Sequence, residues 1–169
     1  YHNCSGKHLG IIALCKTMGY PVETYWRIDN PAQQEILQTL SEMAECPVDQ
    51  IKIGIDGCGF PVFALPLRSI AVAYLKLACP DLIEDEATRS AVAEITGYMN
   101  AHPRMIASHH FMCTALLEDP NIVAKGGAKG VYAFGLKRER MAFAFKVMDG
   151  SEGPWPTIAA SILEQIGYD

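Results

Sequence analysis

The first eight residues carry the densest group of reactive side chains in the sequence. A thiol, a hydroxyl, an amine and two imidazoles follow one another within residues 1–8. A thiol at the start of a helix is a candidate nucleophile or metal ligand, because the helix dipole and neighbouring cations favour the thiolate. If a helix begins near Ser5, Cys4 and Lys7 both lie at its first turn. Cys4 is therefore the first candidate site residue.

A second cysteine follows a short apolar segment later in the chain. Residues 51–55 alternate β-branched with small or polar side chains, which is typical of a strand, and residues 56–59 would end it in a turn. Turns that follow strands often carry functional side chains. Asp56 and Cys58, which lie in this turn, therefore join Cys4 and Lys7 as candidates.

Two thiols with a nitrogen ligand would suit zinc, which binds sulfur and nitrogen in a tetrahedral arrangement. Histidine is the usual nitrogen ligand, whereas a lysine ammonium must first lose a proton. Chemistry alone therefore favours His2 or His8 over Lys7 as the third ligand. A nucleophilic role is the alternative, in which Ser5 or Cys4 attacks a substrate and a histidine acts as base.

Helices are the most frequent elements that the sequence predicts. Helical spacing of apolar residues, capping residues and proline breaks all contribute to these predictions. The predicted helices run from a cap at Ser5 to Gly19, from Asn30-Pro31 to about Ala44, over 67–78, from a cap at Glu84 or Asp85 to before His102, over 111–117 and over 157–166. The helix over 67–78 is apolar nearly all round and should be central.

The pattern changes in the last third of the chain. Large and small residues alternate over 131–136 and 141–147 around a charged turn, which predicts a β-hairpin, and the glycines of 125–130 predict a flexible loop before it. A two-stranded sheet is marginal alone, so this hairpin must pair with residues 51–55 or with strands outside this chain. We expect an α+β protein with a helical region over 1–124 and the hairpin and last helix over 125–169.

Composition limits the class of protein. With 169 residues, 50% apolar and 20% charged, the chain fits a single domain or part of one. A net charge of −5 argues against a nucleic-acid partner, and no apolar run is long enough to span a membrane. The six cysteines form no CxxC pair and are not crowded, so we expect a reducing compartment and a cytoplasmic location.

Four segments resemble a known family. They are residues 2–8 (His-Asn-Cys-Ser-Gly-Lys-His), 54–67 (Gly-Ile-Asp-Gly-Cys-Gly-Phe-Pro-Val-Phe-Ala-Leu-Pro-Leu), 102–107 (His-Pro-Arg-Met-Ile-Ala) and 125–131 (Lys-Gly-Gly-Ala-Lys-Gly-Val). In this order they resemble the L-asparaginase II family, the thermolabile, rhizobial type of asparaginase. The resemblance implies a fold similar to the serine β-lactamases and glutaminases, in which a helical region packs on an antiparallel sheet. It also implies hydrolysis of L-asparagine to L-aspartate and ammonia.

The resemblance also assigns roles to residues of this chain. A zinc-type metal is implied at Cys4, Lys7 and Cys58, so that Lys7 replaces the histidine that chemistry alone would favour. Asp56 falls beside that metal and, with His8, is assigned to substrate binding. Lys125 resembles the lysine of a Lys-x-Gly segment and is the catalytic residue expected from this chain.

Two departures from the family pattern set limits on this chain. The family's nucleophile is expected in a Ser-x-x-Lys segment, but no serine here is followed three positions later by lysine. The nucleophile is therefore expected outside this chain, in an N-terminal segment or a second chain, and a further strand is expected after Asp169. Residues 111–114 read Phe-Met-Cys-Thr where an Arg-Phe-Asp-Thr-like segment is expected, so no substrate-binding role is assigned to that segment.

Two other functions stay open at this point. The chain could be a non-catalytic metal-binding fragment that is active only with the missing segment. It could also be a glutaminase-like amidohydrolase, since pocket dimensions decide the substrate. The expected partners are L-asparagine and the missing segment or second chain, with neither nucleic acid nor membrane, and a homodimer is left open.

Overall fold

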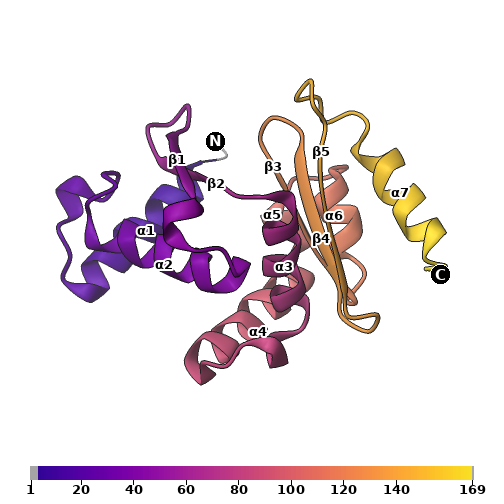
Figure 1. The fold of residues 1–169 in the computed structure, drawn as a ribbon, viewed down its shortest axis with the longest axis horizontal. Coiled ribbons are helices and arrows are strands. Elements are labelled where there is room, and N and C mark those ends of the chain that lie inside the picture. The colour runs from indigo at the N-terminus through magenta and orange to yellow at the C-terminus, as the bar shows by residue number, and fades with distance from the viewer. Residues whose placement is uncertain (1–3, 169) are drawn as a thin grey trace. The chain divides into compact units, whose positions relative to one another are not determined.

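The structure is a computed structural model that describes residues 4–168 (Figure 1). The chain divides into two compact units, Tyr1–Pro66 and Leu67–Asp169, and each unit is described by itself. Both units combine helices with antiparallel strands, so the α+β class is confirmed. None of the helices formed by the described residues has the length and apolarity that crossing a membrane requires.

The first unit contains two long helices and a two-stranded sheet. These are α1 (Ser5–Met18), α2 (Pro31–Ala44), β1 (Lys52–Ile55) and β2 (Pro61–Ala64), with short 3-10 turns at Val22–Thr24 and Val48–Gln50. Helix α1 ends at Gly19, whose φ of 70° is the left-handed conformation that glycine adopts without strain. Helix α2 begins as predicted, because Asn30 Oδ1 accepts from the Ala32 N–H at 3.0 Å and Pro31 is the first helical residue.

The start of α1 differs from the prediction in one respect. Ser5 is the first helical residue and does not cap the helix. Cys4 takes the N-cap position with backbone angles of φ −82° and ψ −11°, and its side chain accepts no capping hydrogen bond from the described part of α1. The prediction was wrong because a serine can also be the first helical residue, so its type alone did not fix where the helix begins.

The strand predicted over residues 51–55 is present as β1, but its partner is local. β1 pairs with β2 in antiparallel register, from Lys52 opposite Ala64 to Ile55 opposite Pro61. The Asp56 N–H donates to the Phe60 carbonyl at 2.9 Å, so the chain reverses directly after β1. Pairing of β1 with the later hairpin, one of the two predicted solutions, is therefore wrong for the described residues.

The second unit holds the remaining elements. They are α3 (Leu67–Ala78), a 3-10 turn (Pro80–Leu82), α4 (Glu86–Ala101), α5 (Pro103–Ile106), α6 (Met112–Leu117), β3 (Ile122–Gly127), β4 (Val131–Leu136), β5 (Met141–Lys146) and α7 (Trp155–Gln165). The helix over 67–78 and the hairpin are confirmed. Asp85 caps α4, because its carboxylate accepts from the Thr88 N–H at 2.7 Å.

The loop predicted over 125–130 is largely wrong. Lys125, Gly126 and Gly127 belong to β3, which pairs along its length with β4 from Ile122 opposite Leu136 to Gly127 opposite Val131. The third strand of the sheet therefore comes from this chain. Close packing explains the glycine at position 126, because a Cβ there would lie 2.7 Å from Cζ3 of Trp155.

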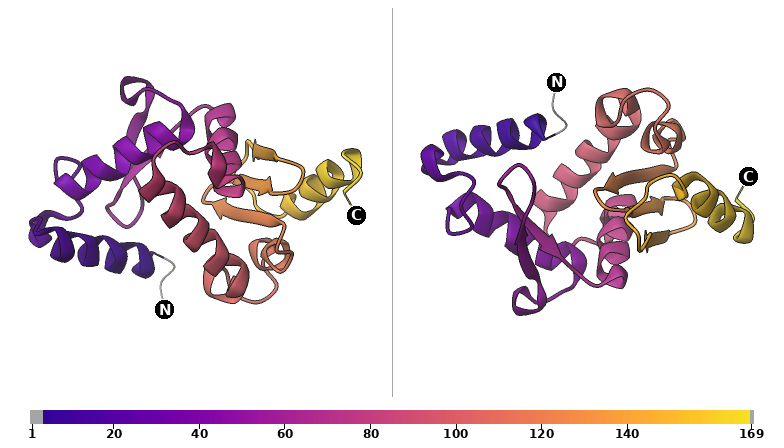
Figure 2. Two further views of the ribbon diagram at one scale, coloured as in Figure 1. Left: turned by 90° about the horizontal axis from the view of Figure 1, so that it is seen from below. Right: turned by 90° about the horizontal axis from the view of Figure 1, so that it is seen from above.

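The sheet of the second unit is covered on both faces, by α3 on one side and α7 on the other (Figures 1 and 2). The fully buried Tyr132, Phe134 and Leu136 of β4 form one core cluster with Trp155 of α7. Because side chains alternate along a strand, Gly135 faces α3 instead. Helix α3 packs against all three strands, which confirms its predicted central position within this unit.

Gly135 should therefore tolerate no side chain. A Cβ at this position would lie 2.6 Å from the Tyr74 carbonyl oxygen and 2.8 Å from the Ala78 Cβ. We expect Gly135→Ala to lower the free energy of unfolding by about 1–3 kcal/mol, since the helix must move away from the sheet. Urea unfolding followed by circular dichroism measures this change.

Gly97→Ala is the matched control in the same unit. Gly97 lies within α4, and a Cβ there would meet nothing within 4 Å. Alanine in a helix interior should raise stability by about 0.5–1 kcal/mol. Equal stability of wild type and Gly135→Ala would contradict the close packing of α3 on the sheet.

Candidate functional site

The turn between β1 and β2 is built around one carboxylate. Asp56 Oδ1 accepts the backbone N–H groups of Cys58 and Phe60, each at 3.0 Å. The Cys58 thiol donates to the same oxygen at 3.0 Å. Aspartate commonly forms such a turn, because its short side chain replaces a backbone acceptor. The turn therefore holds the Cys58 sulfur and the Asp56 carboxylate side by side.

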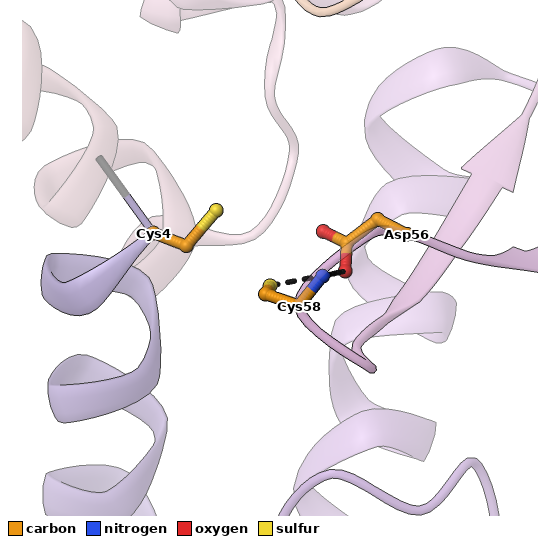
Figure 3. A group of neighbouring side chains, drawn as sticks. All are labelled: Cys4, Asp56 and Cys58. Atoms are coloured by element: carbon orange, nitrogen blue, oxygen red, sulfur yellow. Dashed lines mark hydrogen bonds between the residues drawn. The ribbon is translucent and has the colours of Figure 1, made fainter. Parts of the chain in front are cut away.

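The start of helix α1 supplies the other half of the site. Lys7 Nζ lies 2.5 Å from Asp56 Oδ2. The Cys4 Sγ, the Cys58 Sγ and a carboxylate oxygen of Asp56 all lie within 4.8 Å of one another (Figure 3). Two segments about fifty positions apart in sequence thus meet at one place. The structure brings together Cys4, Lys7, Asp56 and Cys58, four of the residues that the sequence singled out.

His8 lies at the edge of this group. Its Nε2 lies 3.1 Å from the Cys58 Sγ, and its Nδ1 lies 2.9 Å from the Tyr25 hydroxyl. The His8 and Phe60 rings also pack edge to face, with centroids 4.7 Å apart. His2, the other histidine considered as a ligand, lies outside the described residues.

Tyr25 is the residue that sequence reasoning missed. It follows α1 in the connection to α2 and belongs to none of the four recognised segments. A single tyrosine seventeen positions from its histidine partner gives no periodic signal. Only the fold of the connection shows that the two side chains meet.

The charges at the site support one another. Hydrogen bonds from Cys58 and then from Lys7 lower the pKa of Asp56. Burial acts to lower the pKa of Lys7, but its hydrogen bonds to Asp56 and Cys58 outweigh burial and raise it. The hydrogen bond to the Asp56 carboxylate, followed by burial, raises the pKa of the Cys58 thiol. Without a metal, Lys7 and Asp56 are therefore ionised and Cys58 is a thiol.

The donor atoms fit a zinc-type metal in kind. Two sulfurs, a carboxylate and an amine are available, and sulfur donors favour zinc over magnesium or calcium. Tetrahedral zinc with Zn–S bonds near 2.3 Å places its ligand atoms about 3.7 Å apart. The candidate atoms of Cys4, Asp56 and Cys58 lie within 4.8 Å of one another, and Cys58 Sγ and Asp56 Oδ1 are only 3.0 Å apart, so the group is close to the size of such a site.

Lys7 limits how the ligand set is completed. Its ammonium pairs with Asp56, and it must lose a proton to coordinate a metal. One set is Cys4, Cys58 and Lys7, with Asp56 beside the metal. The other is Cys4, Cys58 and Asp56, with Lys7 neutralising the carboxylate.

The remaining predicted site residue belongs to the second unit. Lys125 lies in β3, where its Nζ donates to the Gly126 carbonyl at 2.7 Å and its side chain is exposed. In the segment 111–114, the Thr114 hydroxyl lies 2.5 Å from the Ala107 carbonyl, and the Cys113 sulfur accepts the Gly126 N–H at 3.2 Å. These two side chains support the local fold.

A cavity of about 580 Å³ lies in the same unit between α6 and α7. Its apolar lining includes Met112, Leu116 and Leu163. Its cationic or titratable lining residues include Arg104, His109 and His110. The size is in the range of small-molecule pockets. None of the predicted site residues is among the described residues that line this cavity.

The fold and the site together define an α+β protein in which two thiols, a carboxylate and an amine converge where a helix begins beside a strand turn. The chain belongs to the L-asparaginase II family, whose model matches residues 1–169. This family acts on small-molecule amides by hydrolysis, and its match extends beyond the four segments that carried the resemblance. The search of the curated proteins found no match.

The ionised Asp56 should contribute pH-dependent stability. Asp56→Asn keeps an oxygen for the N–H groups of the turn but removes the charge that pairs with Lys7. At pH 7 we expect a loss of about 1 kcal/mol in the free energy of unfolding, because the pair is only partly buried. Since the folded pKa of Asp56 is lowered, this contribution is complete above its unfolded value of about 4 and is lost as the pH falls through the folded pKa.

Urea unfolding at pH 7 and at pH values below 4 measures this difference. Asp29→Asn is the matched control, because Asp29 pairs with Arg27 on the surface of the same unit. Its stability should stay close to that of wild type at pH 7. A loss for Asp56→Asn that stays the same down to pH 2 would contradict the assigned ionisation.

Proposed function

We propose that this chain is the metal-bearing part of an L-asparaginase that hydrolyses L-asparagine to L-aspartate and ammonia. Cys4, Lys7 and Cys58 are its zinc ligands in this proposal. The observation that carries it is the convergence of these side chains and Asp56 at one turn, in a chain that belongs to the L-asparaginase II family. The structure could have left these residues apart, since they come from separate segments.

The proposed roles follow from the charges at the turn. Bound zinc would supply positive charge that stabilises the reacting centre or orients the substrate carboxylate. Asp56 remains ionised, and 23% of its side chain is accessible. Its carboxylate can therefore accept a hydrogen bond from the α-ammonium group of asparagine. Both ring nitrogens of His8 already have partners, so a part in substrate binding would act through Cys58 and not through direct contact.

The acyl transfer needs a nucleophile that these 169 residues do not provide as Ser-x-x-Lys. We propose that a segment outside them supplies it, within the same polypeptide or from a second chain. Its serine would attack the side-chain amide carbon while the lysine takes the serine proton and passes it to the leaving nitrogen. Ammonia leaves, and water then hydrolyses the acyl ester to give aspartate. Lys125 is a different lysine from the one in Ser-x-x-Lys, and we propose it as the catalytic residue that this chain itself contributes.

The arrangement of the second unit supports a serine β-lactamase-like fold. A three-stranded antiparallel sheet carries α3 on one face and α7 on the other. The order of β3, β4 and β5 leaves one edge of β5 without a strand partner among the described residues. A strand from outside this chain would extend the sheet there. None of the six cysteines, all of which the structure describes, forms a disulfide, which suits the cytoplasmic location that we propose.

The reaction is tested by ammonia release from the protein purified with its native flanking sequence and loaded with zinc. We expect a higher kcat/KM for L-asparagine than for L-glutamine, because the pocket must distinguish one methylene, which is worth about 10–200-fold. Intact-mass analysis of the same sample shows whether a second polypeptide co-purifies.

Each alternative has its own outcome in this assay. An equal or higher kcat/KM for glutamine would replace the asparaginase by a glutaminase-like enzyme. No ammonia from either amide, with zinc present and the sample intact, would leave only a metal-binding fragment.

Cys58→Ser tests the metal site itself. We expect zinc binding to weaken by more than about 10-fold, since loss of a ligand costs more than loss of an outer-shell contact. The KM for asparagine should rise. Cys46→Ala is the matched control, because this buried cysteine lies in the same unit and its sulfur faces the Pro47 carbonyl at 3.9 Å. Unchanged zinc content in Cys58→Ser, measured by mass spectrometry of the metal, would refute the ligand set.

A further inference from the structure

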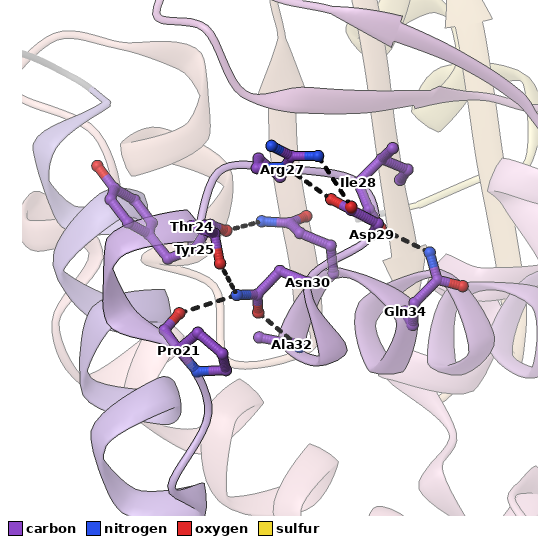
Figure 4. Close-up of polar contacts among 10 residues, drawn as sticks. Pro21, Thr24, Tyr25, Arg27, Ile28, Asp29, Asn30, Ala32 and Gln34 are labelled. Atoms are coloured by element: carbon purple, nitrogen blue, oxygen red, sulfur yellow. Dashed lines mark hydrogen bonds and ion pairs between the residues drawn. The ribbon is translucent and has the colours of Figure 1, made fainter.

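Two buried amides fix the connection between α1 and α2 (Figure 4). Asn30 is 3% exposed, and its Nδ2 donates to the Pro21 carbonyl at 2.9 Å and to the Thr24 hydroxyl at 3.0 Å. Gln33 is 1% exposed, and its Nε2 donates to the Tyr25 carbonyl at 2.8 Å. These bonds tie Pro21, Thr24 and the Tyr25 carbonyl to the start of α2.

The side chain of Tyr25 projects away from this network (Figure 4) and reaches helix α1, where its hydroxyl contacts His8 Nδ1 at 2.9 Å. The two rings meet edge to face with centroids 5.7 Å apart. The Phe60 ring, itself 2% exposed, contacts another part of the His8 ring. His8 is thus held by two aromatic neighbours as well as by hydrogen bonds at both nitrogens.

The direction of these hydrogen bonds follows from counting protons. Asp56 is an ionised carboxylate paired with Lys7, so it can only accept. The bond between Cys58 Sγ and Asp56 Oδ1 therefore uses the single proton of the thiol. The contact of 3.1 Å between Cys58 Sγ and His8 Nε2 must then use a proton on Nε2.

This assignment places a His8 ring proton on Nε2, facing the Cys58 sulfur. With the proton on Nε2, the unprotonated Nδ1 can only accept, and Tyr25 must be the donor. The hydroxyl of Tyr25 donates to His8, His8 donates to Cys58, and Cys58 donates to Asp56. All three bonds point toward the carboxylate at the turn.

We propose that Tyr25 is a positioning residue of the metal centre, because it holds His8 in the tautomer that donates a hydrogen bond to the Cys58 sulfur. This role rests on the proposed metal function of Cys58. If Cys58 held a metal, its sulfur would have no proton of its own but could still accept the N–H bond from His8. Hydrogen bonds from the shell around a metal ligand orient that ligand, and their loss typically weakens metal binding about 10–100-fold.

The geometry favours this role for His8 over direct coordination. His8 is not in the group of described residues whose donor atoms lie mutually within 4.8 Å. Its Nε2 lies at hydrogen-bond distance from the Cys58 sulfur, 3.1 Å, where it can act as a donor to that sulfur. The two roles also predict different effects of substitution.

The first arm of the test measures the zinc dissociation constant of the full-length protein by competition with a chelator. We expect Tyr25→Phe to weaken binding about 10-fold. Tyr20→Phe is the matched control, since Tyr20 lies in the same connection and its hydroxyl bonds to Glu35. His8→Gln, which keeps an N–H donor at the position of Nε2, should retain affinity, and His8→Leu should lose about 10–100-fold. Equal losses for His8→Gln and His8→Leu would instead identify His8 as a ligand and overturn the proposal.

The second arm uses the zinc-free protein and nitrogen-15 NMR of His8. In wild type we expect the proton on Nε2. In Tyr25→Phe, where Nδ1 no longer accepts a hydrogen bond from the tyrosine hydroxyl, we expect the Nδ1 chemical shift to move to the value of an unprotonated nitrogen that accepts no hydrogen bond. An Nδ1–H tautomer in wild type, or an unchanged zinc affinity in Tyr25→Phe, would overturn the proposal. A wild-type protein that binds no zinc would refute the proposed metal function, while the NMR result would still decide the hydrogen-bond order.

Discussion

The site depends on the Asp56 carboxylate, which serves two structural purposes at once. One oxygen closes the turn after β1 by accepting from Cys58 and Phe60, and the other pairs with Lys7 of helix α1. The first purpose fixes the Cys58 sulfur relative to the strand. The second ties the helix start to the hairpin and brings Cys4 to the same place. A neutral side chain could close the turn, but only a charged one also holds Lys7.

The same arrangement sets the conditions for binding a metal. The carboxylate raises the pKa values of Cys58 and Lys7, so both of these candidate ligands keep their protons in the metal-free protein. Metal binding must release these protons, which makes affinity depend on pH. His8 adds a donor to the sulfur that does not change when the thiol proton leaves. Tyr25 and the buried amides behind it keep that donor in place.

Local signals predicted much of the fold, and contacts between distant segments explain the failures. The cap at Asn30 and the apolar helix over 67–78 were confirmed because their signals lie within the element itself. Strand β3 was missed because Gly126 was read as flexibility, whereas it makes room for Trp155, a residue far along the chain. In the site, Cys4, Lys7, Asp56 and Cys58 were found from their segments. Tyr25 was not, since its role exists only once the connection folds against α1.

We propose that the Asp56 turn and the start of α1 hold a zinc-type metal through both sulfurs. Zinc K-edge X-ray absorption of the zinc-loaded full-length protein tests it most directly, because sulfur and nitrogen or oxygen ligands scatter differently. We expect two sulfur ligands, from Cys4 and Cys58, at about 2.3 Å, with nitrogen or oxygen ligands at about 2.0–2.2 Å. A spectrum with only nitrogen and oxygen ligands, or with a single sulfur, would contradict it.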